Sequence, residues 1–238
     1  MRLEPPPTTR SRPDEVATAL RDAAERLGHR PAVTVLLPDG RQEQSVASLA
    51  QWAAKGAHLL ELDLQLEPGD RLHLDVPPSW PAVAVVLACW WAGIAVTLDG
   101  DAEVAVVHAD RDGPAGAEVL RVGDGFDGAP PDTGHDEAWV RAVQAFPDQP
   151  PTPRAASGLA AMVSDGAVLT QAELLAILDE RPGADAGPLG IVAPRDGGVD
   201  ATTLVDLALR PLVSGRPTVV VRGVGREAAD GERVGVWS

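Results

Sequence analysis

Three glycines near the middle of the sequence have the spacing of a dinucleotide-binding fingerprint. Gly123, Gly125 and Gly128 form a GxGxxG pattern directly after a short apolar segment. In that fingerprint the glycine turn leads into a helix, whose N-terminal amides hold a pyrophosphate. Here the next residues are Ala129-Pro130-Pro131, and two consecutive prolines prevent a helix from continuing. We therefore interpret these glycines as part of a turn.

The other residue types that carry chemistry lack the neighbours that such chemistry needs. No serine lies in a GxSxG motif and no Walker A sequence is present, so neither a hydrolase nucleophile nor a P-loop is indicated. The five histidines are dispersed and form no i, i+4 pair, which gives zinc binding little support. No catalytic residue and no metal ligand is predicted. Two patterns suit a core or a solvated loop better than a site, namely Cys89-Trp90-Trp91 as a pocket wall and Asp132, Asp136 and Glu137 as a cation site.

The composition is that of a globular domain and argues against polyanionic partners. Among 238 residues, 20 are Lys or Arg and 35 are Asp or Glu, a formal net charge of −15. Nucleic acids and anionic membranes would repel such a chain. The single cysteine excludes an internal disulfide and fits a reducing compartment, so we expect a cytoplasmic protein. The apolar stretch 81–98 predicts a buried helix and a strand rather than a membrane span, because Ser79 can cap the helix and Gly93 can end it.

Apolar periodicity predicts helices and strands that alternate along the chain. The predicted fold class is therefore α/β, a doubly wound, mostly parallel sheet with helices on both faces. Pro38-Asp39-Gly40 predicts the turn of a hairpin, and Thr170 with Glu173 predicts a capping box. The predicted strands are 33–37, 71–76, 94–98, 104–107, 118–122, 159–163, 189–193 and 218–222, and the predicted helices are 46–60, 80–92, 135–145, 171–178 and 203–213.

Proline-rich stretches suggest how the chain is organised. Residues 1–13 are expected to be a disordered lead-in, and residues 147–154 a linker. Between them, residues 14–146 would form a first α/β subdomain. Residues 155–238 would form a second α/β segment that packs with the first.

Several short motifs follow one another in a distinctive order. A leucine-containing helix precedes Pro68-Gly69-Asp70-Arg71, which is followed by Pro77-Pro78-Ser79-Trp80 and by an alanine–valine helix ending at Ala92-Gly93. Asp165 to Thr170 and Leu209 to Val220 come later. This order resembles the N-terminal region of the adenylate-forming superfamily, which includes acyl-CoA synthetases and the adenylation domains of peptide synthetases. The similar family blocks are PGDRV, PNS, KAGAVYVPLD and PKGVVLTHRNLL. The resemblance extends from about Asp14 to Val221 and implies the fold of that N-terminal body.

The resemblance also shows where this sequence departs from the family. The family's phosphate loop reads TSGTTGxPKG, whereas the stretch 155–166 has lost most of the glycines and threonines, and Asp165 stands in the place of the lysine. The resemblance assigns five residues to the degenerate phosphate loop: Ser157, Gly158, Ser164, Asp165 and Gly166. A carboxylate repels a triphosphate. The chain has no tyrosine for the family's YGxTE block, and the ribose-binding aspartate and the C-terminal domain would lie beyond Ser238.

Three functional hypotheses follow from this comparison. The leading one is a shortened, non-catalytic relative that acts as a binding or interaction module, requires no cofactor, and has a protein partner, a second copy or a small acyl molecule as its ligand. The alternative is half of an AMP-forming acid ligase, which binds an acyl or nucleotide ligand such as ATP or AMP and works with a partner that supplies the missing part. The third is a structural subunit that dimerises through an exposed sheet edge.

Overall fold

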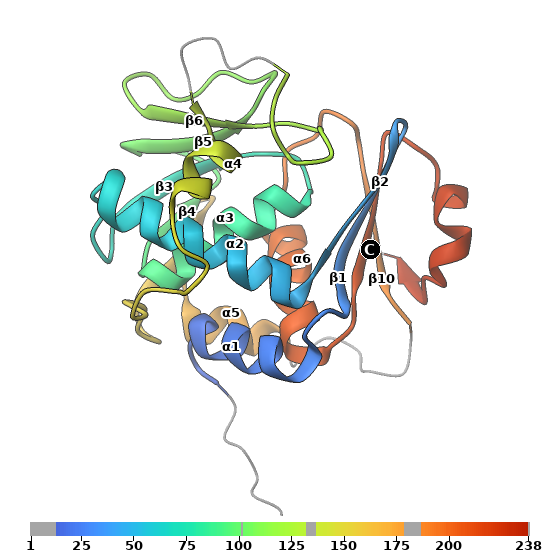
Figure 1. Cartoon of the computed structure of the whole chain (residues 1–238), viewed down its shortest axis with the longest axis horizontal. Coiled ribbons are helices and arrows are strands. Elements are labelled where there is room, and N and C mark those ends of the chain that lie inside the picture. Colours follow the sequence, from blue (N-terminus) through green and yellow to red (C-terminus); the bar gives the residue numbers. More distant parts are fainter. Residues whose placement is uncertain (1–12, 101, 132–136, 179–186, 238) are drawn as a thin grey trace, which may run out of the picture.

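The computed structural model describes residues 13–100, 102–131, 137–178 and 187–237. These residues form two β-sheets with helices between them (Figure 1). The α/β class with mostly parallel strands is confirmed, and the strands are divided between a five-stranded and a seven-stranded sheet.

The five-stranded sheet joins the beginning of the chain to its end. Its order is β12 (Val236–Trp237), β10 (Leu189–Ala193), β11 (Thr218–Arg222), β1 (Pro31–Leu37) and β2 (Gly40–Ser45). All its neighbouring strands are parallel except β1 and β2, which form the predicted hairpin. The sheet therefore depends on pairing between residues that are far apart in the sequence.

The seven-stranded sheet contains the middle of the chain. Its order is β7 (Glu137–Ala138), β6 (Glu118–Val122), β5 (Val104–His108), β3 (Arg71–Asp75), β4 (Ala95–Thr97), β8 (Ala160–Ser164) and β9 (Ala167–Thr170). Every neighbouring pair is parallel except β8 and β9. Parallel strands place their carboxyl ends along one edge of the sheet, where polar loop residues gather.

Local capping chemistry sets the ends of the helices. The helices are α1 (Val16–Leu27), α2 (Val46–His58), α3 (Trp80–Ala92), α4 (Trp139–Ala142), α5 (Gln171–Ile177) and α6 (Ala201–Ser214). Ser45 and Ser79 accept hydrogen bonds from the first turns of α2 and α3, and Thr170 and Glu173 form the predicted capping box of α5. Gly93 and Gly215 end α3 and α6 in the left-handed conformation that glycine adopts without strain.

Helix α3 lies at the centre of the core. All thirteen of its residues are buried, because it packs against α2, α1 and α6. The apolar stretch 81–98 is thus a buried helix followed by β4, as predicted, and Cys89-Trp90-Trp91 belongs to the core. Among the described residues, no helix has both the length and the apolar character required to cross a bilayer.

The crossing of α2 over α3 depends on one small residue. A Cβ atom added at Gly56 would lie 2.7 Å from the Cβ of Ala88 and 3.2 Å from the ring of Trp139.

A π-helical turn, η1 (Leu59–Asp63), extends α2, and a second small hydrophobic cluster lies between β11 and the 3₁₀ helix η3 (Arg226–Glu232). Neither η1 nor η3 was predicted.

One predicted helix differs from the structure. For the segment 135–145 the sequence predicts a single helix, but its described part begins with the short strand β7, followed by α4 and the 3₁₀ turn η2 (Val143–Ala145). Residues 137 and 138 pair in parallel with β6, and this non-local pairing overrides the local helical pattern. Asp132 and Asp136 of the suggested cation site lie outside the described residues.

The predicted linker 147–154 contains no helix or strand. It is nevertheless attached to the core, because the indole nitrogen of Trp91 donates to the carbonyl of Pro151 (3.0 Å). Strands that precede and follow this segment occur in both sheets. The division into two subdomains stays a prediction.

Candidate functional site

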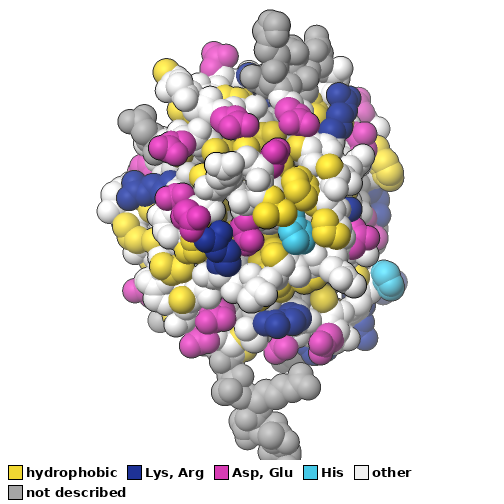
Figure 2. Space-filling model, turned by 60° about the vertical axis from the view of Figure 1, so that its left-hand side comes forward, with side chains coloured by type: hydrophobic (Ala, Val, Ile, Leu, Met, Phe, Trp, Pro, Cys, Tyr) yellow, Lys and Arg dark blue, Asp and Glu magenta, His cyan; other side chains and the backbone are white. Residues whose placement is uncertain are grey.

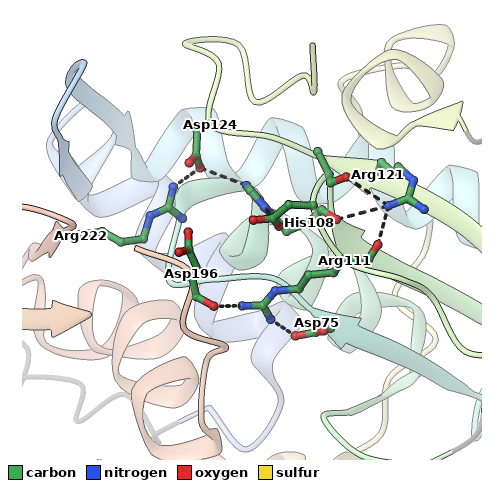
Figure 3. Close-up of polar contacts among 9 residues, drawn as sticks. Asp75, His108, Arg111, Arg121, Asp124, Asp196 and Arg222 are labelled. Atoms are coloured by element: carbon green, nitrogen blue, oxygen red, sulfur yellow. Dashed lines mark hydrogen bonds and ion pairs between the residues drawn. The ribbon is translucent and has the colours of Figure 1, made fainter. Parts of the chain in front are cut away.

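Polar side chains converge where the carboxyl ends of strands from the two sheets face each other (Figure 3). From the seven-stranded sheet come residues at or after the ends of β3, β5 and β6, and from the five-stranded sheet residues at or after the ends of β10 and β11. Open α/β sheets bind ligands at this kind of edge. The labelled members are Asp75, His108, Arg111, Arg121, Asp124, Asp196 and Arg222, which we call the inter-sheet cluster.

Arg222 is the most deeply buried charge of the inter-sheet cluster. It is the last residue of β11 and is only 1% exposed, because its side chain points into the space between the sheets. Its Nη2 donates to Asp124, whereas its Nε and Nη1 have no partner among the described residues. Burial lowers the pKa of Arg222 to about 10. Removing this guanidinium from water is therefore unfavourable, and the attraction of one carboxylate only partly offsets that unfavourable free energy.

His108 lies between two carboxylates. Its Nδ1 contacts Asp110, and its Nε2 lies 3.3 Å from Oδ1 of Asp124. The hydrogen bond with His108 lowers the pKa of Asp110. Both contacts can be donated at once only by the doubly protonated ring. Both ring nitrogens of His108 are thus in contact with neighbouring carboxylates.

Arg111 joins the two sheets through its guanidinium. Its Nη1 pairs with Asp75 at the end of β3, and its Nη2 donates to the carbonyl of Asp196 (2.6 Å) in the loop after β10. Arg121 in turn donates to the carbonyl of Arg111 (2.6 Å). The loop approaches closely at Gly198, where an added Cβ would lie 3.4 Å from Nη1 of Arg111. The arrangement therefore links the two sheets through one side chain.

The residues assigned to the degenerate phosphate loop fall into two groups. Ser164, Asp165 and Gly166 lie together at the hairpin between β8 and β9, whereas Ser157 and Gly158 precede β8. A strand of five residues spans roughly 16 Å at about 3.3 Å per residue. The structure therefore brings three of the five together and places the other two at the opposite end of the strand.

The hairpin itself is as short as a β-hairpin can be. Asp165 and Gly166 are its two turn residues, and both have positive φ, 50° and 75°, as a tight two-residue turn requires. The backbone amide of Asp165 donates to Oδ2 of Asp99 (2.9 Å). The turn is therefore tight, the amide of Asp165 already has a hydrogen-bond partner, and two carboxylates, those of Asp99 and Asp165, lie close to it.

The charge of Asp165 matters less than the sequence suggests. Asp165 is exposed, so its repulsion of a phosphate at 4 Å is nearer the ~1 kcal/mol of water than the ~4 kcal/mol of a partly desolvated site. The connection between β8 and β9 is a two-residue turn, so it offers few backbone amides to a bound group.

The GxGxxG segment forms a compact loop that closes on itself. The amide of Gly123 donates to the carbonyl of Gly128 (2.9 Å), and the amide of Gly128 donates to that of Gly125 (2.8 Å). A Cβ at Gly128 would lie 2.6 Å from the ring of Trp80. The described residues 123–131 contain no helix, which agrees with the interpretation of these glycines as a turn.

The inter-sheet cluster was missed because its members are far apart in the sequence. Asp75, His108 and Arg222 each end a strand that was predicted, or nearly so. The available signal was therefore a set of charged residues at the carboxyl ends of parallel strands. What the sequence could not supply was the strand order within each sheet and the packing of the two sheets, which bring the ends of β5 and β11 to the same carboxylate, Asp124. Among the described residues, no group of three His, Cys, Asp or Glu side chains could hold a metal ion.

Comparison with known proteins places this geometry in a wider context. No protein-family model matches the chain. A curated Mycobacterium tuberculosis protein (strain ATCC 25618 / H37Rv), described as "TIGR03089 family protein", is 40% identical over 80 residues, which are 33% of each chain. That partial match does not extend over enough of either protein to transfer a function.

Solved structures match over most of the chain. An acyl-CoA synthetase from Brucella canis has a TM-score of 0.65 at 17% identity and covers 87% of this chain. A long-chain-fatty-acid-CoA ligase from Archaeoglobus fulgidus has a TM-score of 0.68 at 13% identity over 92%. An amide bond synthetase from Marinactinospora thermotolerans has a TM-score of 0.66 at 18% identity over 92%. This chain spans less than half the length of these proteins, namely 43%, 49% and 47%. At these identities the likeness establishes the fold, and the chain has the fold of the N-terminal body of adenylate-forming enzymes.

Proposed function

We propose that this chain is a non-catalytic binding or interaction module built on the fold of adenylate-forming enzymes. The observation that carries the proposal is the connection between β8 and β9. The resemblance matches the family's ten-residue phosphate loop to the stretch 155–166, whereas here residues 160–164 form strand β8 and the two residues Asp165 and Gly166 make the turn. A phosphate loop works by surrounding the phosphates with several backbone amides, and two residues cannot do so.

The one lysine of the sequence does not stand in for the lysine of the family's loop. Lys55 is the only lysine in the sequence, and it lies on α2. Its Nζ donates to the carbonyl of Phe146 (2.7 Å) and pairs with Asp148 (2.9 Å). The ammonium group of Lys55 therefore already has two partners in the segment after η2.

The surroundings of the hairpin are acidic. Asp99 and Asp165 are adjacent there, and the chain as a whole carries a net charge of −15. On the face drawn in Figure 2, acidic side chains are scattered among groups of hydrophobic ones, with fewer basic ones. A nucleoside triphosphate approaching this protein meets repulsion at long range and finds few donors at short range.

The decisive experiment measures nucleotide binding and adenylation separately. Isothermal titration of the full chain with magnesium-ATP is expected to give no saturable heat. ATP–pyrophosphate exchange is expected to stay at background with a panel of short, medium and aromatic carboxylic acids and amino acids. Circular dichroism of the same sample shows that the chain is folded. Saturable ATP binding, or exchange with any acid, would refute the proposal.

A matched variant separates the loop argument from the charge argument. Asp165→Lys restores the cation without restoring the loop, and Asp63→Lys makes the same charge change on the exposed end of η1. Because the missing amides are the main obstacle, neither variant is expected to bind ATP. Binding by Asp165→Lys alone would show that charge, and not loop length, had abolished it.

A second candidate function is favoured by the edge of the seven-stranded sheet. Strand β9 pairs only with β8 among the described residues, and Val168 on it is 52% exposed. A partner's strand that extended this sheet could supply the missing part of an acid ligase. Under this alternative, exchange activity appears in the complex purified from the native source and is lost with Val168→Lys. A complex without exchange activity would dismiss it.

A further inference from the structure

A cavity of about 550 Å³ opens between two segments that the proposed function has not used. One wall is the turn of the β1–β2 hairpin and the other is the GxGxxG loop after β6, both in the upper part of Figure 1. The volume lies within the range of about 300–1,000 Å³ that is usual for small-molecule sites. The residues that matter here are Leu37, Asp39, Gln42, Asp124, Phe126 and Pro131.

Hydrogen bonds fix the two walls relative to each other. The buried side chain of Gln42 on β2 donates from Nε2 to the carbonyls of Asp124 (2.8 Å) and Gly125 (3.1 Å). The loop is closed by its own hydrogen bonds, and at Gly128 it rests on the ring of Trp80. The cavity is therefore bounded by segments tied to the fold, so a ligand need not order them on binding.

One side of the cavity is apolar and carries an exposed aromatic ring. Phe126 is 85% exposed, the most exposed of the large hydrophobic side chains described. Leu37 and Pro131 line the cavity beside it. A phenyl ring left in water at the mouth of a cavity offers a face on which another ring, or a cation, can stack.

The charge around the cavity is negative. Asp39 has no ion-pair partner among the described residues, and Asp124 uses Oδ1 for both Arg222 and His108. The cation of the lining, Arg41, is already engaged by Glu43 (2.6 Å) and Glu232 (2.8 Å). With the net charge of −15, this arrangement repels anions and attracts cations.

We propose that this cavity binds a small organic cation with an aromatic ring, an arylalkylamine in chemical class. The ring stacks on Phe126 against the apolar wall, and the ammonium group faces the carboxylate of Asp39, while Asp124 stays paired with Arg222 and His108. This inference deepens the proposed function, on which it rests, by naming a ligand class for the binding module. The site is separate from the hairpin at Asp165.

Calorimetric titration of the full chain tests the ligand class with three probes of similar size. The probes are 2-phenylethylamine, 2-phenylethanol and 3-phenylpropionate, which are cationic, neutral and anionic at neutral pH. The amine is expected to bind about tenfold more tightly than the anion, with the alcohol between them, because an exposed carboxylate attracts an ammonium group by up to about 1 kcal/mol and repels an anion by a similar amount. The proposal would be overturned if the amine gave no saturable binding, or if the anion bound as tightly as the amine.

Two substitutions locate the site. Phe126→Ala and Asp39→Asn are each expected to weaken amine binding about fivefold, as the loss of one aromatic stacking contact or of one exposed ion pair implies. Leu62→Ala, at a 65% exposed residue outside the cavity lining, is the control and is expected to change nothing. Amine binding that both cavity variants leave within twofold would place it elsewhere and reject this site. The result is distinguishable from that of the ATP titration, since either can fail while the other holds.

Discussion

The two partners of the Arg222–Asp124 ion pair differ greatly in burial. Arg222 is 1% exposed, whereas the side chain of Asp124 is 33% exposed. Removing the anion therefore leaves a desolvated cation, while removing the cation leaves a carboxylate that water can reach. The cost of breaking the pair should depend on which partner is removed.

We predict that Asp124→Asn is the more damaging substitution. It is expected to lower the free energy of unfolding by about 3 kcal/mol, and Arg222→Met by only about 1 kcal/mol. Urea unfolding at neutral pH measures both. Equal losses, or the reverse order, would show that Arg222 has a partner other than Asp124.

The carboxyl group of Glu173 makes the stabilising effect of the α5 capping box depend on pH. Its carboxylate accepts from the amide and the hydroxyl of Thr170, both at 2.8 Å, and the backbone hydrogen bond chiefly lowers the pKa of Glu173. A carboxyl whose pKa is lower in the folded chain stabilises the fold above its unfolded pKa, about 4.3. That stability is lost as the pH falls through the folded pKa.

We therefore expect Glu173→Gln to lose stability less steeply on acidification than the unmodified chain. Urea unfolding between about pH 5 and pH 3 should show the two free energies of unfolding converging. Glu25→Gln, at an exposed position of α1, serves as the control. Parallel curves for Glu173→Gln and the unmodified chain would exclude the capping box as the acid-sensitive element.

At the scale of the elements, the α2–α3 crossing leaves little room for a larger side chain at Gly56. Glycine within a helix costs about 1 kcal/mol relative to alanine, so Gly56→Ala would stabilise an isolated α2. Here the new methyl group meets Ala88 at 2.7 Å. We expect a net destabilisation of about 1–3 kcal/mol, as overpacking of a core implies.

Thermal unfolding of Gly56→Ala against Gly231→Ala checks this prediction. Gly231 has nothing within 4 Å of an added Cβ and no positive φ, so its substitution is expected to have little effect. A Gly56→Ala chain at least as stable as the unmodified one would mean that the helices separate at low cost.

The elements that the sequence predicts well are those decided by local chemistry. The caps at Ser45, Ser79 and Thr170 and the stops at Gly93 and Gly215 depend on residues within one turn. The strands β6, β10 and β11 have the bounds that their apolar runs indicate. In contrast, β7 and the division into two sheets depend on pairing across long stretches of chain, which no local pattern encodes.

The sites follow the same distinction. Ser164, Asp165 and Gly166 form a tight turn, which their types favour. The inter-sheet cluster depends on β11 lying beside β1 and on β5 lying beside β3, and so could not be assembled from sequence. The cavity beside Phe126 likewise combines β2 with a loop some eighty residues later.

At the scale of the molecule, both sheets contain strands from before and after the segment 147–154. A cut in this segment leaves β1 paired with β11 and β4 paired with β8. We predict that a protease site placed there can be cleaved without separating the two pieces. They should elute together in gel filtration and retain their circular dichroism, whereas elution as two folded species would support two independent domains.

The hairpin at Asp165 and Gly166 also makes the chain a simple scaffold for engineering. Lengthening the connection from two to ten residues costs only about 1.4 kcal/mol in closure entropy, because its ends are already held by β8 and β9. A glycine- and threonine-rich insertion with a lysine could therefore be grafted between Ser164 and Ala167 while the rest of the fold is kept. If the grafted chain binds a nucleotide and the unmodified chain does not, the inserted loop alone is enough to give this scaffold nucleotide affinity.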